Sequence, residues 1–83
     1  MTTPPLNVTI HDTADLGAQL RAHRERLRLT QATAAALSGV STRLWSECET
    51  GKRTHVAFET VIRMLNTVGI DLAVISRRNA IAE

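Results

Sequence analysis

A single glycine between two short helix-forming segments is the feature that most constrains the fold of this chain. Residues 31–38 contain three consecutive alanines, which combine high helix propensity with very little bulk. Thr30 can cap the start of this segment, and Gly39 can end it in a left-handed conformation. Ser41 can then cap a second helix, which we expect to end at about Thr50. The sequence therefore predicts two short helices joined by a tight turn.

Two further helices are predicted on either side of this pair. Asp12 offers an N-cap side chain, and the apolar residues that follow at helical spacing predict a helix over about residues 13–28. Residues 57–68 carry apolar side chains at helical spacing and predict a fourth helix that Gly69 ends. The chain has one Trp, one Phe and no Tyr, so its core must be mainly aliphatic, which suits packed helices. The apolar positions of the fourth helix are Phe58, Val61, Ile62, Leu65 and Val68.

The segment after the fourth helix has the alternation of a β-strand. Within residues 70–76, the apolar Ile70, Leu72 and Val74 alternate with smaller or polar side chains, and they form the predicted dimer interface. A lone strand needs a mate, which is either Leu6 to Ile10, or the same strand of a two-fold-related copy, or both. A chain of 83 residues buries only about 60–65% of its unfolded surface, which favours a partner copy. The simpler alternative is a strand that covers the fourth helix of its own monomer.

The chain is predicted to form a single domain. Residues 1–11 are a lead that holds the short N-terminal strand, and residues 12–69 form the helical domain. Residues 70–76 form the dimerisation strand, and residues 77–83 are a polar tail. The predicted fold class is therefore all-α with a short C-terminal strand, without an internal repeat.

Composition excludes several classes of protein. The net charge of +2 and a pI near 9.5, with nine of the ten cationic side chains from arginine, fit an anionic partner without requiring one. The single cysteine excludes an internal disulfide and fits a reducing compartment. No apolar run approaches about 18 residues and no signal peptide is recognisable, so we expect a cytoplasmic protein without a membrane partner.

The sequence shows no enzyme signature. It lacks a phosphate-cradling glycine loop, paired catalytic carboxylates and the spacing of a nucleophile triad. His11, His23 and His55 are scattered, which favours satisfied or surface imidazoles over metal ligands. We therefore expect no enzyme activity, no catalytic residues, no metal and no cofactor.

The two short helices and their turn fit a helix-turn-helix, in which the second helix enters the major groove of DNA. Ala35 lies where the two helices would cross, and Val40, Trp45 and Cys48 would face inward. At about 100° per residue, this orientation turns four other side chains of the second helix outward. The residues predicted to face the bases are Thr42, Arg43, Ser46 and Glu47.

Four segments of the sequence also occur in the order and at the spacing of a known family. They are LRLTQ, SGVS, ECETGKR and LNTVGIDL, within a match of about 60 of the 83 residues. Through them the chain resembles the Cro/cI-like, or XRE-type, helix-turn-helix regulators, and most closely the HipB-like antitoxins. The resemblance implies a lambda-repressor-like domain of four or five helices. In the HipB-like branch it also implies a dimer closed by a C-terminal strand.

The resemblance further implies roles for individual residues. It gives base contacts to Thr42 and Arg43, and an arginine can donate two hydrogen bonds to guanine. Glu47 either accepts from a cytosine amino group or orients Arg43. Arg24 and Glu49 would form a partly buried ion pair between the first and third helices. Phosphate contacts are predicted for Gln31, Ser41, Lys52 and Arg53.

Three positions depart from the pattern of the family. The family usually places a medium aliphatic residue where Trp45 stands and a leucine or isoleucine where Cys48 stands, and its usual leucine in the second helix is Ala34 here. We hypothesise that the space left at Ala34 accommodates the Trp45 indole. Trp45 is predicted to be a core residue, with an exposed stacking or partner-binding residue as the alternative, and Cys48 is predicted to be a small buried hydrophobe. For Arg43, the simpler interpretation is one more solvated arginine.

These observations favour a dimeric, sequence-specific DNA-binding protein, a transcriptional repressor associated with the nucleoid. Two copies of the reading helix would meet an inverted-repeat operator in double-stranded DNA, with half-site centres about 10 base pairs apart. The resemblance implies an antitoxin that neutralises a HipA-like kinase toxin and represses their shared operon. Two alternatives stay open, namely a phage-type or restriction-modification controller without a toxin and a protein-interaction module with the same fold.

Overall fold

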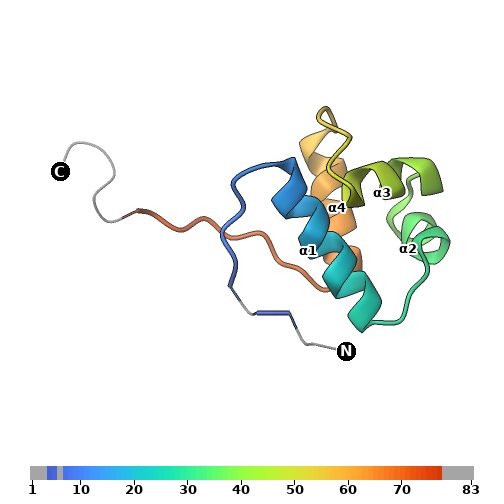
Figure 1. Cartoon of the computed structure of the whole chain (residues 1–83), viewed down its shortest axis with the longest axis horizontal. Helices are drawn as coiled ribbons and strands as arrows, with labels where there is room; N and C mark the ends of the chain where they lie inside the picture. Colours follow the sequence, from blue (N-terminus) through green and yellow to red (C-terminus); the bar gives the residue numbers. More distant parts are fainter. Residues whose placement is uncertain (1–3, 6, 78–83) are drawn as a thin grey trace.

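The computed structural model describes residues 4–5 and 7–77, and within them the chain forms four α-helices and no β-strand (Figure 1). The helices are α1 (Thr13–Arg26), α2 (Gln31–Ser38), α3 (Thr42–Glu49) and α4 (Phe58–Thr67). All four helices predicted from the sequence are confirmed, and a fifth helix is absent from the described residues. None of the four described helices has the length and apolar character needed to cross a lipid bilayer.

Local capping explains where the first three helices begin. The side chains of Asp12, Thr30 and Ser41 each accept a hydrogen bond from the backbone N–H three residues later, at 2.8–3.0 Å. Gly39 ends α2 with a φ of 78°, the left-handed conformation that favours glycine. The tight turn between α2 and α3 is therefore formed as the sequence predicts.

The end of α1 is set by a residue other than glycine. Arg28 has a φ of 59°, so the helix ends at Arg26, slightly before the predicted end near residue 28. The Leu29 N–H donates to the Arg24 carbonyl at 3.2 Å, and Arg24 Nη1 donates to the Leu29 carbonyl at 2.7 Å. Two hydrogen bonds thus hold the chain reversal that leads from α1 into α2.

Trp45 is the largest side chain of the core and has no exposed surface. It lies on α3, which packs against both α1 and α2, while α4 packs against α2. The inward orientation predicted for Trp45 and Cys48 is confirmed, because both are buried. The buried cluster consists of Leu20, Ala34, Ala35, Trp45, Cys48, Met64, Leu65 and Val68.

The carboxylate of Glu49 is the polar centre of this core, with 2% of its side chain exposed. It accepts hydrogen bonds from Arg24 through Nε and, at 3.1 Å, through Nη2. It also accepts from Gln31 Nε2 at 2.9 Å and from Trp45 Nε1 at 2.6 Å. The donors come from α1, α2 and α3, so one anion joins three helices.

The same contacts set the ionisation of Glu49. Burial acts to raise the pKa of its carboxyl group, because a charged group loses hydration. The hydrogen bonds from Arg24, Gln31 and Trp45 and the positive charge of Arg24 outweigh burial, so the pKa of Glu49 lies below its ordinary value. The hydrogen bonds that Arg24 donates to the Glu49 carboxylate raise the pKa of Arg24 despite burial. Both members of the pair are therefore charged at neutral pH.

Gly17 allows α1 to approach the end of α3 very closely. A Cβ atom at this position would lie 2.6 Å from the Glu49 carbonyl oxygen and would also overlap the Cys48 carbonyl oxygen. Real Cβ atoms do not approach backbone oxygens to this distance, so the crossing requires glycine in the middle of a helix.

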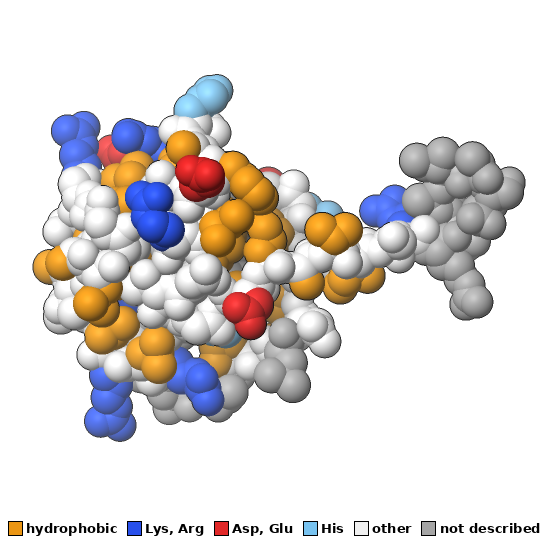
Figure 2. Space-filling model, turned by 180° about the vertical axis from the view of Figure 1, so that it is seen from behind, with side chains coloured by type: hydrophobic (Ala, Val, Ile, Leu, Met, Phe, Trp, Pro, Cys, Tyr) orange, Lys and Arg blue, Asp and Glu red, His pale blue; other side chains and the backbone are white. Residues whose placement is uncertain are grey.

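The C-terminal segment corrects the prediction of a strand. After Ile70, residues 71–77 extend away from the helices, and residues 7–10 lead into α1 (Figure 1). Neither segment has strand structure, and Leu6 lies outside the described residues. A strand exists only through hydrogen bonds to a neighbouring strand, and the described residues of the two segments do not pair within one chain. Apolar side chains line this extension (Figure 2), and Val74 is 95% exposed.

Phe58 departs from the predicted apolar stripe of α4. Its side chain is 66% exposed, whereas Leu65 and Val68 further along the same stripe are buried. Phe58 is the first residue of α4, and helical side chains lean towards the N-terminus, which carries this ring past the end of the packed helices.

We predict that Glu49→Gln lowers the free energy of unfolding by about 3–5 kcal/mol at pH 7, because the buried Arg24 guanidinium loses its anion. The folded pKa of Glu49 lies below that of an unfolded glutamate, about 4.3. The contribution of this carboxylate is therefore complete above that unfolded value and is lost as the pH falls through the folded pKa. Chemical denaturation between pH 7 and pH 3 should show the two proteins converging in stability in acid.

The matched control for this comparison is Glu59→Gln, which removes the same charge from an exposed position at the start of α4. Its effect on the free energy of unfolding should stay within about 0.5 kcal/mol. Equal losses in the two variants would show that general charge, and not the buried network, is responsible.

We predict that Ala34→Leu destabilises the domain by about 1–3 kcal/mol, because Ala34 and Trp45 are both completely buried in one cluster and a larger side chain would have to displace its neighbours. Thermal unfolding measures the change. Ala36→Leu, on the exposed face of the same helix, is the control and should change stability by less than about 0.5 kcal/mol. A higher melting temperature for Ala34→Leu would contradict the volume-compensation hypothesis.

Candidate nucleic-acid interface

The N-terminal end of α3 presents two side chains to solvent. Thr42 and Arg43 are exposed, and 88% of the Arg43 side chain is accessible. Trp45 and Cys48 hold the opposite side of the same helix in the core. Ser46 and Glu47, also predicted to face the bases, are only half-exposed. The outward face of α3 is therefore open at its start and becomes partly covered towards its end.

Glu47 gathers two arginines at this surface. Its Oε2 accepts a hydrogen bond from Arg43 Nε at 3.2 Å, and its Oε1 accepts from Arg53 Nη1 at 2.9 Å. Of the two roles predicted for Glu47, the free protein shows the contact that would orient Arg43. Ion pairs as exposed as these typically contribute about 0.2–1 kcal/mol each, whereas a bidentate arginine–guanine contact is worth about 1–3 kcal/mol of discrimination. The pair with Glu47 is therefore too weak to prevent a contact between Arg43 and a base.

The geometry leaves Arg43 able to read a base while it is held. Among its contacts with the described residues, Arg43 donates a side-chain hydrogen bond only from Nε. Both terminal nitrogens of the guanidinium thus remain available to acceptors such as guanine O6 and N7.

The loop after α3 carries the two other cationic side chains that are predicted to contact DNA, Lys52 and Arg53. Gly51, with a φ of 75°, reverses the chain directly after the helix. The N–H groups of Lys52 and Arg53 then donate to the Glu47 carbonyl at 3.0 and 3.4 Å. Lys52 and Arg53 are exposed beside α3, which suits contacts with a phosphate backbone.

The two remaining predicted phosphate contacts lie at helix N-termini. Gln31 is the first residue of α2, and its side-chain amide donates one hydrogen bond to Glu49, which leaves a second amide hydrogen. Ser41 caps α3 with its oxygen, so its hydroxyl hydrogen is free to donate. Both positions add unpaired backbone N–H groups that favour anions. The described contacts join Gln31 to Glu49 but do not join Gln31 or Ser41 to the Arg43–Glu47–Arg53 cluster.

Arg24 and Glu49, which the resemblance pairs, lie together in the structure. Two other side-chain hydrogen bonds, from Trp45 to Glu49 and from Arg53 to Glu47, were not predicted. The Trp45 bond to Glu49 spans four residues of one helix, a spacing visible in the sequence. The Arg53 bond to Glu47 spans six residues across a turn, for which no sequence rule exists. Trp45 therefore both fills the core and positions the carboxylate.

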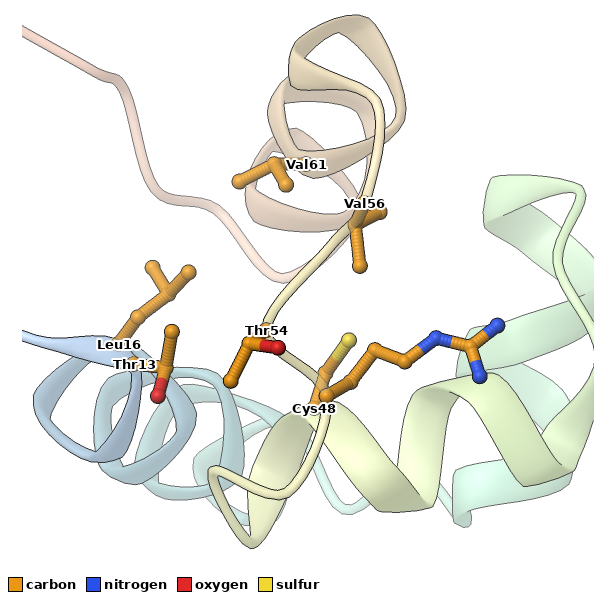
Figure 3. A pocket seen from close by; sticks show the side chains of 7 residues that line it. Thr13, Leu16, Cys48, Thr54, Val56 and Val61 are labelled. Carbon is orange, nitrogen blue, oxygen red and sulfur yellow. The ribbon is translucent and has the colours of Figure 1, made fainter.

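A small cavity lies behind α3, next to Cys48 (Figure 3). Burial is the main cause that raises the pKa of the Cys48 thiol, so the group is neutral at physiological pH. The described residues contain no cluster of three or more His, Cys, Asp or Glu side chains arranged to hold a metal ion. The side chains that line the cavity are Thr13, Leu16, Cys48, Arg53, Thr54, Val56 and Val61.

The three residues predicted for the dimer interface differ in their surroundings. Ile70 is half-buried and packs against the core of its own chain, and its N–H donates to the Leu65 carbonyl at 2.9 Å. Leu72 and Val74 are exposed. Of these three side chains, only Leu72 and Val74 are therefore mainly exposed to solvent.

Comparison with known proteins places this geometry in a family. A family model described as a helix-turn-helix domain matches residues 15–77. Among solved structures, the chain is similar to the restriction-modification controller protein C.AhdI from Aeromonas hydrophila, with 28% sequence identity and a TM-score of 0.66. That match covers 72% of this chain and 86% of the controller chain. A search of curated proteins finds no match.

The residues matched by the family model run from the first turn of α1 past the end of α4, so they include both helices of the motif and the loop that follows them. The chain therefore belongs to the helix-turn-helix domain family.

Proposed function

We propose that this protein is a sequence-specific DNA-binding regulator of transcription. The observation that carries the proposal is the orientation of α3, with Trp45 locked in the core and Arg43 fully presented at the other side of the helix. In this arrangement Thr42 and Arg43 contact base edges, while Lys52 and Arg53 contact phosphates. The proposal assigns no chemical reaction to the chain.

The regulator would bind as a homodimer to an inverted repeat. The segment after α4 supports this, because it exposes apolar side chains beside a broad groove that it forms with residues 7–11 and α1. A two-fold dimer places the same surface of both copies in contact, and pairing of residues 70–76 would supply the neighbouring backbone that a single chain lacks. Two α3 helices would then meet successive major grooves about one helical turn apart.

Similarity to a restriction-modification controller supports the alternative of a controller regulator without a toxin for this chain. The antitoxin role, with a HipA-like kinase toxin as partner, stays a prediction from the resemblance of the sequence. The two roles share the DNA interface and differ only in the additional partner. Co-purification of the full chain with the product of the adjacent gene separates them, because only an antitoxin forms a stable complex with a kinase.

We predict that Arg43→Ala and Lys52→Ala weaken DNA binding in different ways. In titrations against the upstream DNA of the gene and scrambled DNA, Arg43→Ala should remove discrimination at one base position, by about 1–3 kcal/mol. Lys52→Ala should weaken binding to all sequences about equally and reduce the salt dependence of binding, because it removes a phosphate contact.

Equal effects of the two variants would contradict this division between base-reading and phosphate-binding residues. If the unaltered protein binds upstream and scrambled DNA with the same affinity, the DNA-binding proposal fails and the alternative of a protein-interaction module on the same fold is favoured.

We predict that Val74→Asp converts the dimer into a monomer, because it places a charge on an apolar surface that a second copy would bury. Val74 is almost fully exposed within one chain, so the melting temperature of the isolated domain should not depend on it directly. Sedimentation equilibrium measures the change in mass. Leu37→Asp, at an exposed apolar position on α2, is the control and should leave the dimer intact. Dimers of unchanged stability in both variants would exclude the C-terminal segment from the interface.

A further inference from the structure

Glu47 binds the loop that follows α3 through both its backbone and its side chain. Its carbonyl accepts hydrogen bonds from the N–H groups of Lys52 and Arg53 at 3.0 and 3.4 Å and from Thr50 Oγ1 at 3.1 Å. Its carboxylate holds the Arg53 guanidinium at 2.9 Å and Arg43 at 3.2 Å. One residue therefore connects the start of α3 to the loop beyond its end.

We propose that Glu47 is a positioning residue that determines operator specificity by fixing Arg43 in the orientation needed for base reading and by coupling it to the phosphate-binding loop. The inference rests on the proposed function of DNA binding. It assigns Glu47 to Arg43 and Arg53 and not to a cytosine amino group.

The geometry supports an effect on the orientation of Arg43. Glu47 accepts a hydrogen bond from Arg43 Nε and so restricts the Arg43 side chain, while the two terminal nitrogens of Arg43 stay free for an acceptor on a base. An arginine that is already ordered loses less conformational freedom when it binds a base. Because Arg43 is 88% exposed, no packing contact could replace this restraint.

The charge of Glu47 supports a second, opposite effect on affinity. A carboxylate beside Arg43 and Arg53 offsets part of the positive charge that attracts phosphates. It also holds Arg53 in an ion pair, which competes with a contact between Arg53 and a phosphate. Glu47 should therefore weaken binding to unrelated DNA while it strengthens the preference for the operator. A residue that only stabilised the fold would not shift these two quantities in opposite directions.

The test is Glu47→Gln, which keeps the size of the side chain and removes its charge. We expect the ratio of operator affinity to scrambled-DNA affinity to fall about three- to tenfold. Affinity for scrambled DNA should rise, and its dependence on salt should become steeper as Arg53 becomes available to a phosphate. Circular dichroism should show unchanged helix content and folding.

Glu25→Gln is the matched control. Glu25 accepts from Arg21 Nε at 3.1 Å in an exposed pair of the same spacing, but on α1. This variant changes the net charge equally and should leave the affinity ratio unchanged. In a double-mutant cycle, Glu47→Gln should cause no further loss of discrimination once Arg43→Ala is present, because both act on one contact.

The outcomes separate the inference from the proposed function. An unchanged or increased affinity ratio in Glu47→Gln, or additive losses in the double mutant, would overturn the positioning role while DNA binding stands. If the unaltered protein shows no operator preference, the proposed function fails and this inference fails with it.

Discussion

The structure depends on one buried anion. The Glu49 carboxylate receives donors from α1, α2 and α3 and closes the core that Trp45 fills. Burial of a charged group is unfavourable by several kcal/mol unless partners converge on it, and here three side chains converge. Since Glu49 is the last residue of α3, this network fixes the C-terminal end of α3 relative to two other helices.

The two ends of α3 consequently have different properties. The C-terminal end is held by buried hydrogen bonds, whereas the N-terminal end carries exposed side chains in weak ion pairs. An eight-residue helix is about 12 Å long, so the rigid end and the open end lie close together. The buried network therefore fixes the position of α3 in the free protein, and the terminal nitrogens of Arg43 stay available for recognition.

Sequence reasoning predicted what local rules determine. Asp12, Thr30 and Ser41 cap their helices by accepting a hydrogen bond from the backbone N–H three residues later. Such caps can be predicted because they depend only on residues close together in the sequence. The burial of Trp45 and Cys48 was predicted from their positions in the helix-turn-helix pattern. The prediction of a strand at residues 70–76 was wrong for a single chain. Alternation of apolar and polar residues shows which side of a strand would be buried, but it does not show whether a neighbouring strand is present to pair with it. The contact of Arg53 with Glu47 escaped prediction because it depends on the path of a loop.

The glycine at the crossing of α1 and α3 has a consequence for the way such a domain can vary. Gly17 carries only a hydrogen atom in place of a side chain, so α1 lies directly against the last carbonyl groups of α3. This contact sets the position of α3 relative to α1. Any larger residue there would push α1 and the end of α3 apart and so change the tilt of α3 within the domain. In the proposed complex with DNA, side chains on α3 would set the base preference, while Gly17 would set the angle at which α3 meets the groove without contacting DNA itself.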